Sequence, residues 1–461
     1  MKEPIQTFDL VVVGAGSGNS VLTADFSDWK VAIVERDTFG GTCLNRGCIP
    51  SKMLVYAADM AHQAGRTAHL GIDTSLDNVR WADIVGRVFG RIDPIAHSGE
   101  DYRQSLDNVT VFKANARFVG HQTLELVSPS HNQSNVREQI TGRHIVLAAG
   151  ARPFVPPIAG LDSVTYHTSD SIMRIEDVPE RLVIIGGGYI ASELGHVFEA
   201  LGSHVCIVHR SDRLLRAADA GVSTTFTEIM AERMDCALGS DILGVSQAGS
   251  EITVTTEART ISGDALLVAT GRVPNGDQLE LAQTGVQLNS HGYVVTDEFL
   301  QTHTEGIWAL GDICHSAQLK HTANEDTRVV AHNIANPQHL RSPNYSHIPY
   351  AVFGHPQVAA VGATEQHLQA TRTPFVRAIR RYGDTAYGWA MEDTRSFVKL
   401  LAHPQTRLLL GAHILGPQAP TLIQQLIQGM QFGLTVDQMA HGQLYIHPAL
   451  TEVVEQALLE L

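Results

Sequence analysis

The sequence predicts an α/β fold with two Rossmann-like dinucleotide-binding domains, followed by a third region with a different pattern. Two glycine-rich turns, at residues 14–19 and 186–195, each lie between a short apolar run and a segment of helical pattern. A strand, a glycine turn and a helix in this order are typical of dinucleotide-binding folds. The 461 residues also exceed the roughly 250–300 residues at which one hydrophobic core stops growing. Two or three domains are therefore expected.

The first glycine turn reads Gly-Ala-Gly-Ser-Gly-Asn and follows an apolar run. Gly14, Gly16 and Gly18 allow a pyrophosphate to approach the backbone amides at the start of the next helix. Glu35 ends the second apolar run, 21 positions after Gly14, where an acid can accept a hydrogen bond from a ribose hydroxyl. Asn19 stands where a third glycine would allow close packing of helix on strand. The approach of that helix therefore stays open.

The second glycine turn contains Gly186 and Gly188, and the strand after it ends at His209 and Arg210. An NAD site usually has an acid at this position, and an acid would repel a 2′-phosphate, whereas arginine would hold it. Arg210 and Arg216 stand six positions apart. A solvated basic loop is the alternative, but the position at the end of the second strand favours NADPH. Two such turns in one chain imply two dinucleotides.

Two cysteines, Cys43 and Cys48, lie in the glycine-containing segment 40–53. Structural thiols or half of a metal site would be the simpler interpretation, but a closed zinc site needs four ligands and no second cysteine pair completes one. No metal is therefore predicted. We interpret the pair as a reactive dithiol that can cycle with a disulfide. If the segment begins a helix, its amides favour a thiolate, and Lys52 lies about one turn after Cys48.

Two further motifs contain an acidic residue that could take part in cofactor binding or in acid-base catalysis. Asp312 follows an apolar run and Gly311, where it can accept from a cofactor hydroxyl or simply serve as a turn aspartate. His447 precedes Glu452 by five positions, so an imidazole could act as a base that a carboxylate orients. Among 23 histidines, a lone His-Pro pair carries little weight by itself.

The composition narrows the possible partners and location. The net charge is −15 and no sustained basic run occurs, which argues against nucleic acid. The N-terminus has no basic segment followed by an apolar one, and no long uninterrupted apolar stretch occurs, so we expect a cytoplasmic protein without a membrane partner. Five cysteines fit a reducing compartment with one switched pair. Cys206, Cys236 and Cys314 are then packing residues.

Regular elements are expected between these motifs. The segments 56–68 and 81–95 show helical patterns, and the second is expected to stop near Pro94. The polar stretch 128–139 is expected to form a hairpin or loop. Strands are expected at the apolar runs 8–13, 31–34, 145–149, 182–185, 205–208 and 265–268.

The order of these motifs along essentially the whole chain resembles the flavin- and pyridine nucleotide-dependent disulfide reductases. This family (class I, glutathione reductase-like) includes glutathione, dihydrolipoamide and mycothione reductases. The resemblance implies FAD and NADPH as cofactors, a redox-active Cys43–Cys48 disulfide and a homodimer. It also implies four segments: 1–155 and 273–345 for FAD, 156–272 for NADPH, and 346–461 as an α+β dimerisation domain.

The resemblance also assigns roles to single residues. Cys48 would contact the flavin, Cys43 would attack the substrate disulfide, and Lys52, paired with Glu193, would lie beside the reactive nitrogen of the flavin. His447, oriented by Glu452, would be the acid-base residue and would reach the cysteines of the other subunit. Tyr189 would cover the nicotinamide side of the flavin, and Asp312 would bind its ribityl chain. The remaining expected cofactor-binding residues are Gly14, Gly16, Ser17, Gly18, Glu35, Gly41, Thr42, Gly150, Gly186, Gly188, Ile190, His209, Arg210, Arg216 and Gly271.

Within the family, three stretches resemble mycothione reductases: the Gly-Ser-Gly-Asn-Ser of the first turn and the segments 87–95 and 382–393. The small-molecule disulfide implied is mycothiol disulfide (mycothione). Dihydrolipoamide dehydrogenases use NAD, which His209 and Arg210 disfavour, and mercuric reductases usually add a C-terminal cysteine pair, whereas no cysteine follows Cys314. Another low-molecular-weight disulfide reductase, such as a glutathione reductase, is a further alternative. A flavin-binding scaffold without catalysis is the alternative from another class.

Overall fold

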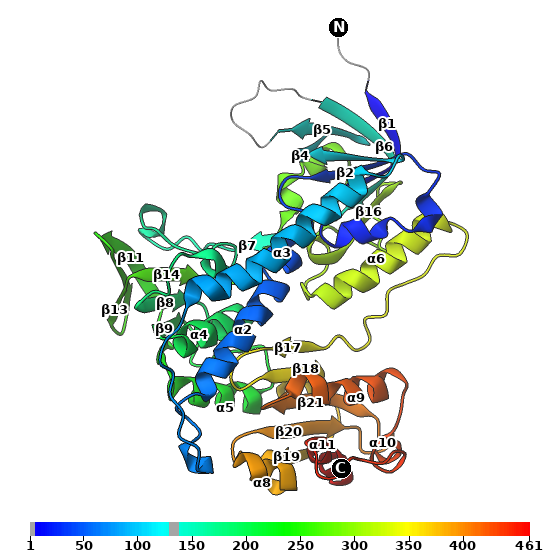
Figure 1. Ribbon diagram of the computed structural model, residues 1–461. Helices are drawn as coiled ribbons and strands as arrows, with labels where there is room; N and C mark the ends of the chain where they lie inside the picture. Colours follow the sequence, from blue (N-terminus) through cyan, green and yellow to red (C-terminus); the bar gives the residue numbers. More distant parts are fainter. Residues whose placement is uncertain (1–4, 129–137) are drawn as a thin grey trace. The chain divides into compact units, whose positions relative to one another are not determined.

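The computed structural model describes residues 5–128 and 138–461 (Figure 1). Its internal contacts divide the chain into two compact units. The first unit contains Met1–Ser51, Asp83–Phe154 and Arg272–Tyr345; the second contains Lys52–Ala82, Val155–Gly271 and Ser346–Leu461. Most of the polar stretch expected at 128–139 lies outside the described residues. Within the described part of the chain, no helix is both long enough and apolar enough to cross a membrane.

The first unit is built on a seven-stranded sheet of order β3-β2-β1-β6-β5-β4, with β16 paired to β6 (Figure 1). Strands β1, β2, β3 and β16 run parallel to their neighbours, while β4, β5 and β6 pair in antiparallel fashion. The strands are β1 (Gln6–Val13), β2 (Val31–Glu35), β3 (Val109–Lys113), β4 (Asn115–Gly120), β5 (Thr123–Val127), β6 (Glu138–Leu147) and β16 (Ile307–Ala309). A short ladder of β7 (Ala151–Pro153) and β15 (Arg272–Pro274) lies outside this sheet.

Both faces of the parallel part of this sheet are covered. Leu10 and Val12 of β1 pack in one cluster with apolar side chains of α6 (Lys320–Ala335), whereas Val11 and Val13 pack in a second cluster on the other face. Burial of both faces explains why the apolar runs of the sequence are continuous and not alternating. The ends of β1, β2, β6 and β16 carry the residues expected to bind the first dinucleotide.

Two helices differ in length from their predicted bounds. Helix α3 (Trp81–Gln104) continues through Pro94, so the predicted stop there is wrong. Ile92 and Ala96 keep its buried stripe, and Pro94 is exposed, so the carbonyl that loses its partner can bond to water. Helix α2 (Cys48–Gln63) ends before the predicted residue 68, because Gly65 takes a left-handed conformation with φ +77°.

The second unit contains a four-stranded parallel sheet of order β10-β9-β8-β14. Its strands are β8 (Arg181–Ile185), β9 (His204–His209), β10 (Asp235–Leu238) and β14 (Ala265–Val268), with helices α4 (Tyr189–Ala200) and α5 (Ala220–Ala231) between them in the chain. A three-stranded antiparallel sheet accompanies it, formed by β11 (Ile242–Ala248), β12 (Glu251–Thr256) and β13 (Thr260–Gly263). The two sheets share one hydrophobic cluster.

The C-terminal part of the second unit is an antiparallel sheet of order β17-β18-β21-β20-β19 (Figure 1). Its strands are β17 (Tyr350–Val352), β18 (Val358–Gly362), β19 (Val376–Arg381), β20 (Phe397–Ala402) and β21 (Leu409–Leu415). Helices α9 (Ala419–Gln431), α10 (Val436–His441) and α11 (Thr451–Leu459) pack on one face. Helices α7 (Glu365–Thr371) and α8 (Ala386–Met391) connect its strands. The predicted fold class, α/β with an α+β C-terminal region, is confirmed.

Candidate active site

The first glycine turn packs tightly against the end of β6. A Cβ on Gly14 would lie 2.3 Å from the carbonyl oxygen of Ala148, and a Cβ on Gly18 would lie 2.6 Å from the Cβ of Ala148. Gly18 thus provides the close packing that the fingerprint would place at position 19. The helix expected after the turn is not a regular α-helix: the chain forms two short 3₁₀ segments, η1 (Ser17–Val21) and η2 (Ala24–Phe26).

Asn19 explains part of this departure. The guanidinium of Arg103, on α3, donates to the side-chain oxygen of Asn19 at 2.7 Å and to its backbone oxygen at 2.8 Å. A carbonyl in a regular helix would instead accept from the amide four residues later. The hydrogen bond from Arg103 to the Asn19 carbonyl therefore takes the place of a helical hydrogen bond.

Three expected flavin-site residues lie at the carboxyl edge of the same sheet. Glu35 ends β2, Gly150 follows β6 with φ +63°, and Asp312 follows β16 in the 3₁₀ segment η8 (Gly311–Ile313). Because these strands are parallel, their carboxyl ends meet at one edge, where open α/β sheets bind ligands. Burial raises the pKa of the Asp312 carboxyl, and the charge of Arg272 opposes that shift.

Glu35 is held in place by the backbone of the glycine turn. Its carboxylate accepts from the N–H of Ala15 at 2.7 Å and from the N–H of Asp37 at 2.8 Å, and the residue is only 8% exposed. The cysteine segment begins against the same turn, since a Cβ on Gly41 would lie 2.7 Å from the Cα of Gly16. The absence of side chains at Gly16 and Gly41 thus brings two expected cofactor-binding segments together.

The two cysteines are thiols that share a hydrogen bond. Cys43 lies in the short helix α1 (Gly41–Asn45), and Cys48 is the first residue of α2. The hydrogen bond to Cys48, and then burial, raise the pKa of the Cys43 thiol. Both effects oppose loss of the Cys43 proton. The N-terminus of a 16-residue helix also stabilises negative charge on the Cys48 sulfur.

Lys320, which no sequence motif marks as a site residue, belongs to this group. Its Nζ donates to the side chain of Ser17 in the glycine turn at 2.8 Å, and its charge lowers the pKa of Cys43 against the larger opposing effects. A cation thus lies beside the turn that is expected to bind a pyrophosphate. Ser17 and Lys320 are 303 positions apart, so no local pattern in the sequence indicates their contact.

The second glycine turn is covered by His209 and tied to the loop that follows it. A Cβ on Gly187 would lie 2.5 Å from the His209 ring, and the N–H of Leu215 donates to the carbonyl of Gly187 at 2.8 Å. Arg210 and Arg216 are exposed on the loop between His209 and Asp219. Burial, followed by the charges of these arginines, lowers the pKa of His209. Arg210 and Arg216 are therefore the chain neighbours of His209 and Leu215, which contact the expected glycine turn.

Lys52 and Glu193, expected as a pair, are in contact within the second unit. Lys52 Nζ lies 2.6 Å from Oε2 of Glu193, which is 5% exposed. The other oxygen of Glu193 accepts from the N–H of Phe353 at 2.9 Å, and Lys52 Nζ lies 4.8 Å from the centre of the Phe353 ring. Phe353 was missed, because nothing near it in the sequence indicates this role. Tyr189 is the first residue of α4 and is partly exposed.

His447 and Glu452 form the expected dyad just before and at the start of α11. His447 Nδ1 lies 2.8 Å from Oε1 of Glu452. An ionised carboxylate only accepts, so Nδ1 carries the proton and Nε2 is left to exchange one. The His447 side chain is 72% exposed, and its neighbours Leu444 and Ile446 are also largely exposed.

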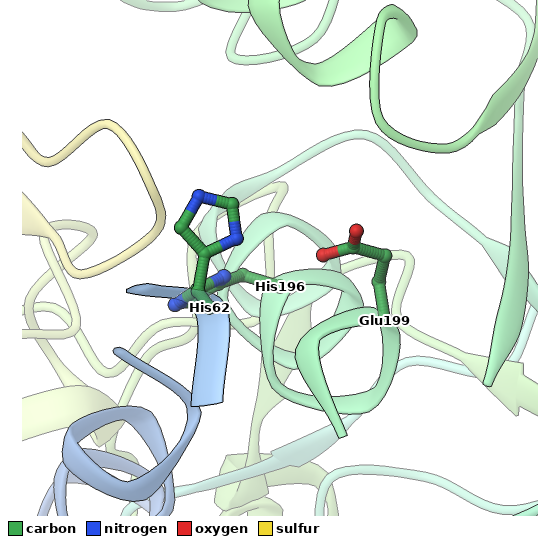
Figure 2. A group of neighbouring side chains, drawn as sticks. All are labelled: His62, His196 and Glu199. Carbon is green, nitrogen blue, oxygen red and sulfur yellow. The ribbon is translucent and has the colours of Figure 1, made fainter. Parts of the chain in front are cut away.

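A cluster outside the predicted site contains groups that often bind metals. Figure 2 shows His62 of α2 with His196 and Glu199 of α4, whose ligand atoms lie within 4.8 Å of one another. His196 is fully buried; its Nε2 lies 2.9 Å from Asp59 and its Nδ1 lies 3.0 Å from the guanidinium of Arg233. The same guanidinium pairs with Glu199. Arg233 thus places a positive charge beside His196 and Glu199, and the cluster brings together side chains of α2 and α4.

The remaining cysteines lie in packing positions. Cys206 and Cys236 are on adjacent parallel strands, but Cys206 is paired in register with Asp235 and Cys236 with Ile207. Neighbours in register point to the same face, so the two thiols point to opposite faces. Burial raises the pKa of Cys206 to about 12 and that of Cys236 to about 11. Burial also raises the pKa of Cys314 well above its usual range, which makes all three poor nucleophiles.

Comparison with known proteins defines the class. Residues 8–327 match the pyridine nucleotide-disulphide oxidoreductase family, and residues 348–458 match the dimerisation domain of that family. The chain belongs to the pyridine nucleotide-disulphide oxidoreductases and carries their dimerisation domain. It is an oxidoreductase of a family that is defined by a pyridine nucleotide and a disulphide.

Two curated relatives and one solved structure show how similar the chain is to individual proteins. The mycothione reductase of Mycobacterium tuberculosis (strain ATCC 25618 / H37Rv) is 46% identical over 462 aligned positions, which cover 99% of this chain and 100% of that protein. The glutathione reductase of Burkholderia cepacia is 31% identical and covers 96% of this chain and 97% of its own. Among solved structures, the HOCl-induced flavoprotein disulfide reductase RclA of Escherichia coli has a TM-score of 0.85 and 26% identity, covering 98% and 99% of the two chains. The predicted resemblance to mycothione reductases is confirmed.

Proposed function

We propose that the chain reduces mycothiol disulfide (mycothione) to mycothiol, with NADPH as the electron donor. The asymmetric Cys43–Cys48 pair at the start of α2 is the observation that carries the disulfide chemistry. The 46% identity to a mycothione reductase supports the substrate, compared with 31% for a glutathione reductase and 29% for the dihydrolipoyl dehydrogenase of Bacillus subtilis. An inert flavin-binding scaffold fits poorly with an intact dithiol and an intact His447–Glu452 dyad.

The two glycine turns fit dinucleotides. At Gly14 and Gly186 a Cβ would collide with a backbone carbonyl, so each turn needs a glycine to pass this close to the neighbouring strand end. Bound FAD and NADPH would supply the electron pair that reduces the Cys43–Cys48 disulfide. In this proposal Gly14, Gly16, Ser17, Gly18, Glu35, Gly41, Thr42, Lys52, Gly150 and Asp312 hold the flavin, and Gly186, Gly188, Tyr189, Ile190, Glu193, His209, Arg210 and Arg216 hold NADPH. Gly271 is a further cofactor-binding residue.

The reduced dithiol then acts on the substrate in two steps. The Cys43 thiol gives its proton to Nε2 of His447, and the Cys43 sulfur attacks one substrate sulfur to form a mixed disulfide. The departing thiolate takes that proton from His447. The Cys48 thiolate next attacks the Cys43 sulfur, releases the second thiolate and restores the Cys43–Cys48 disulfide. A second proton, delivered through His447, completes two molecules of thiol.

We also propose that His447 serves the cysteines of a second copy in a homodimer. Support comes from the matched dimerisation domain and from the exposure of the segment that carries His447. Leu444 is 99% exposed and Ile446 74% exposed, although both are large apolar side chains. Apolar side chains that protrude on both sides of an acid-base residue are expected where another subunit packs.

The test is NADPH and NADH oxidation by the purified yellow protein, with mycothiol disulfide, glutathione disulfide and lipoamide offered in parallel. We expect fast turnover only with NADPH and mycothiol disulfide. A preference for NADH and lipoamide would overturn both the cofactor assignment at the arginines and the substrate. A protein that NADPH reduces but that turns over none of the three disulfides would overturn the substrate alone.

A further inference from the structure

The segment 210–218, here called the arginine loop, is held at its end by residues of the C-terminal sheet. Asp219 follows the loop and is completely buried. Its carboxylate accepts from Lys399 Nζ at 2.7 Å and from the N–H of Glu365 at 3.0 Å, and it caps α5 by accepting from the N–H of Gly221 at 3.0 Å. Lys399 is 3% exposed and also pairs with Glu365 at 2.6 Å.

Gln366 forms hydrogen bonds with the backbone on both sides of Asp219. Its side-chain amide donates to the carbonyl of Ala218 at 2.8 Å, and its side-chain oxygen accepts from the N–H of Ala220 at 3.1 Å. Glu365 and Gln366 are the first two residues of α7, and Lys399 lies in β20. We call Glu365, Gln366 and Lys399 the loop anchor.

The other attachment of the arginine loop is the second glycine turn itself. The N–H of Leu215 donates to the carbonyl of Gly187 at 2.8 Å, and Leu215 is held with φ +51°. Arg216 therefore lies between two fixed points: Leu215, which is tied to the glycine turn, and Asp219, which is tied to the loop anchor. The backbone carrying the exposed guanidinium of Arg216 is restrained on both sides, although its side chain is open to solvent.

Stability alone is a weak reason for this arrangement. The desolvation of a buried ion pair costs as much as or more than its attraction returns, and apolar replacements of such pairs are often neutral or stabilising. A fixed position of the loop is a benefit that apolar packing would not supply, because hydrogen-bonded charges accept only one geometry.

We propose that Lys399, Glu365 and Gln366 are positioning residues that set the selectivity for NADPH over NADH by fixing the arginine loop. The inference rests on the proposed binding of the 2′-phosphate by Arg210 and Arg216. None of the three anchor residues needs to touch the nucleotide. Their effect passes through Asp219 and the loop backbone to the guanidinium of Arg216.

The test compares three variants of the holoenzyme with a reference. Gln366→Ala removes the two hydrogen bonds to the loop backbone without leaving a buried charge. Lys399→Met removes the cation of the buried pair and leaves the Asp219 carboxylate without it. Arg395→Ala is the matched control, because Arg395 joins the same C-terminal sheet to the opposite end of α5 through Glu232 at 2.9 Å. Arg216→Ala is the reference for direct contact. The readouts are the inhibition constants of adenosine 2′,5′-bisphosphate and of adenosine 5′-monophosphate.

We expect the bisphosphate to bind about tenfold more weakly to Gln366→Ala and Lys399→Met, with the monophosphate unchanged. The Arg395→Ala variant should match the wild type for both inhibitors. Equal weakening of both inhibitors, or no change in Gln366→Ala, would overturn the positioning role. If Arg216→Ala also leaves bisphosphate binding unchanged, then the proposed NADPH site fails and not only the inference built on it. Retention of bound flavin shows that each variant is folded.

Discussion

The two glycine turns of this chain each begin with a glycine packed against a backbone carbonyl, Gly14 against Ala148 and Gly186 against Ala269, but they lead into different local structures. After the first turn, Asn19 engages Arg103 and the chain forms 3₁₀ segments. After the second turn, the small buried Ala191 occupies the corresponding position and the regular helix α4 follows. A small third residue lets a helix pack closely on its strand. The first glycine of each turn therefore sets its contact with the neighbouring strand, while the residues after the turn determine the local structure that follows.

The strand ends differ in the same way. Glu35, at the end of β2, is held by the N–H groups of Ala15 and Asp37 and offers a carboxylate. His209, at the end of β9, covers Gly187 and is followed by an arginine loop. One region therefore suits ribose hydroxyls beside a dithiol, and the other suits a phosphate. Substitutions that disable one region and spare the other test this division.

The largest effect is expected from Cys48→Ser, which disables the first region only. Disulfide reduction should fall by at least about a thousandfold, because the resolving thiolate is absent. Binding of adenosine 2′,5′-bisphosphate should stay unchanged, since the arginine loop is intact. The measurements are steady-state NADPH oxidation with mycothiol disulfide and inhibitor titration. Substantial remaining turnover would contradict the assigned role of the dithiol.

The next effect is expected from the double variant Arg210→Ala, Arg216→Ala, which disables the second region only. Each lost charge-assisted hydrogen bond is worth about 1.5–3 kcal/mol, so kcat/KM for NADPH should fall about a hundredfold or more. The kcat/KM for NADH should change little. Steady-state kinetics with both nucleotides measure this, and Arg395→Ala is again the control. A parallel loss for NADH would mean that the arginines support folding and do not select the phosphate.

A smaller effect concerns the helix that only the second turn begins. Helix α4 carries His196, whose cluster includes His62 and His355. Burial, followed by the charge of Arg233, lowers the pKa of His355 to about 4 from 6.5. Between pH 6.5 and about pH 4, His355 binds a proton in the unfolded chain but not in the folded chain. Protonation of the unfolded chain therefore lowers the free energy of unfolding as the pH decreases from 6.5 towards 4, whereas His355 has no such effect above pH 6.5.

His355→Gln should therefore reduce the dependence of the unfolding free energy on pH. Titration of His355 is expected to change the free energy of unfolding by at most about 3 kcal/mol over this pH window. Urea unfolding of the wild type and of the variant at a series of pH values between 7.5 and 4.5 measures the difference. His321→Gln, an exposed histidine of the first unit, is the control. Identical pH slopes for wild type and His355→Gln would contradict a neutral His355 in the folded chain.

Local patterns in the sequence were sufficient to predict several features. The apolar runs that became β1, β2, β8 and β9, the positions of both glycine turns, and the spacing of Cys43 and Cys48 are short-range features. Contacts between distant segments were not predictable in this way. Lys399 lies 180 positions from Asp219, and Lys320 lies 303 positions from Ser17, so only the folded chain brings them together. The failures at Pro94 and Asn19 have a similar cause, because exposure and a distant arginine overrode the local preference.

The smallest effect is expected from Asn19→Ala, which gives the first turn the residue type found at the second. The variant loses the side-chain hydrogen bond from Arg103, but the backbone carbonyl at position 19 keeps its own bond to that guanidinium. The net change in the free energy of unfolding should therefore stay within about 1–2 kcal/mol. Arg103→Ala removes both bonds and should destabilise the protein more. Thermal unfolding followed by flavin fluorescence measures both variants. If Asn19→Ala is the more damaging of the two, the side chain of Asn19 has a role beyond holding Arg103, and the 3₁₀ geometry after the first turn is not explained by that guanidinium.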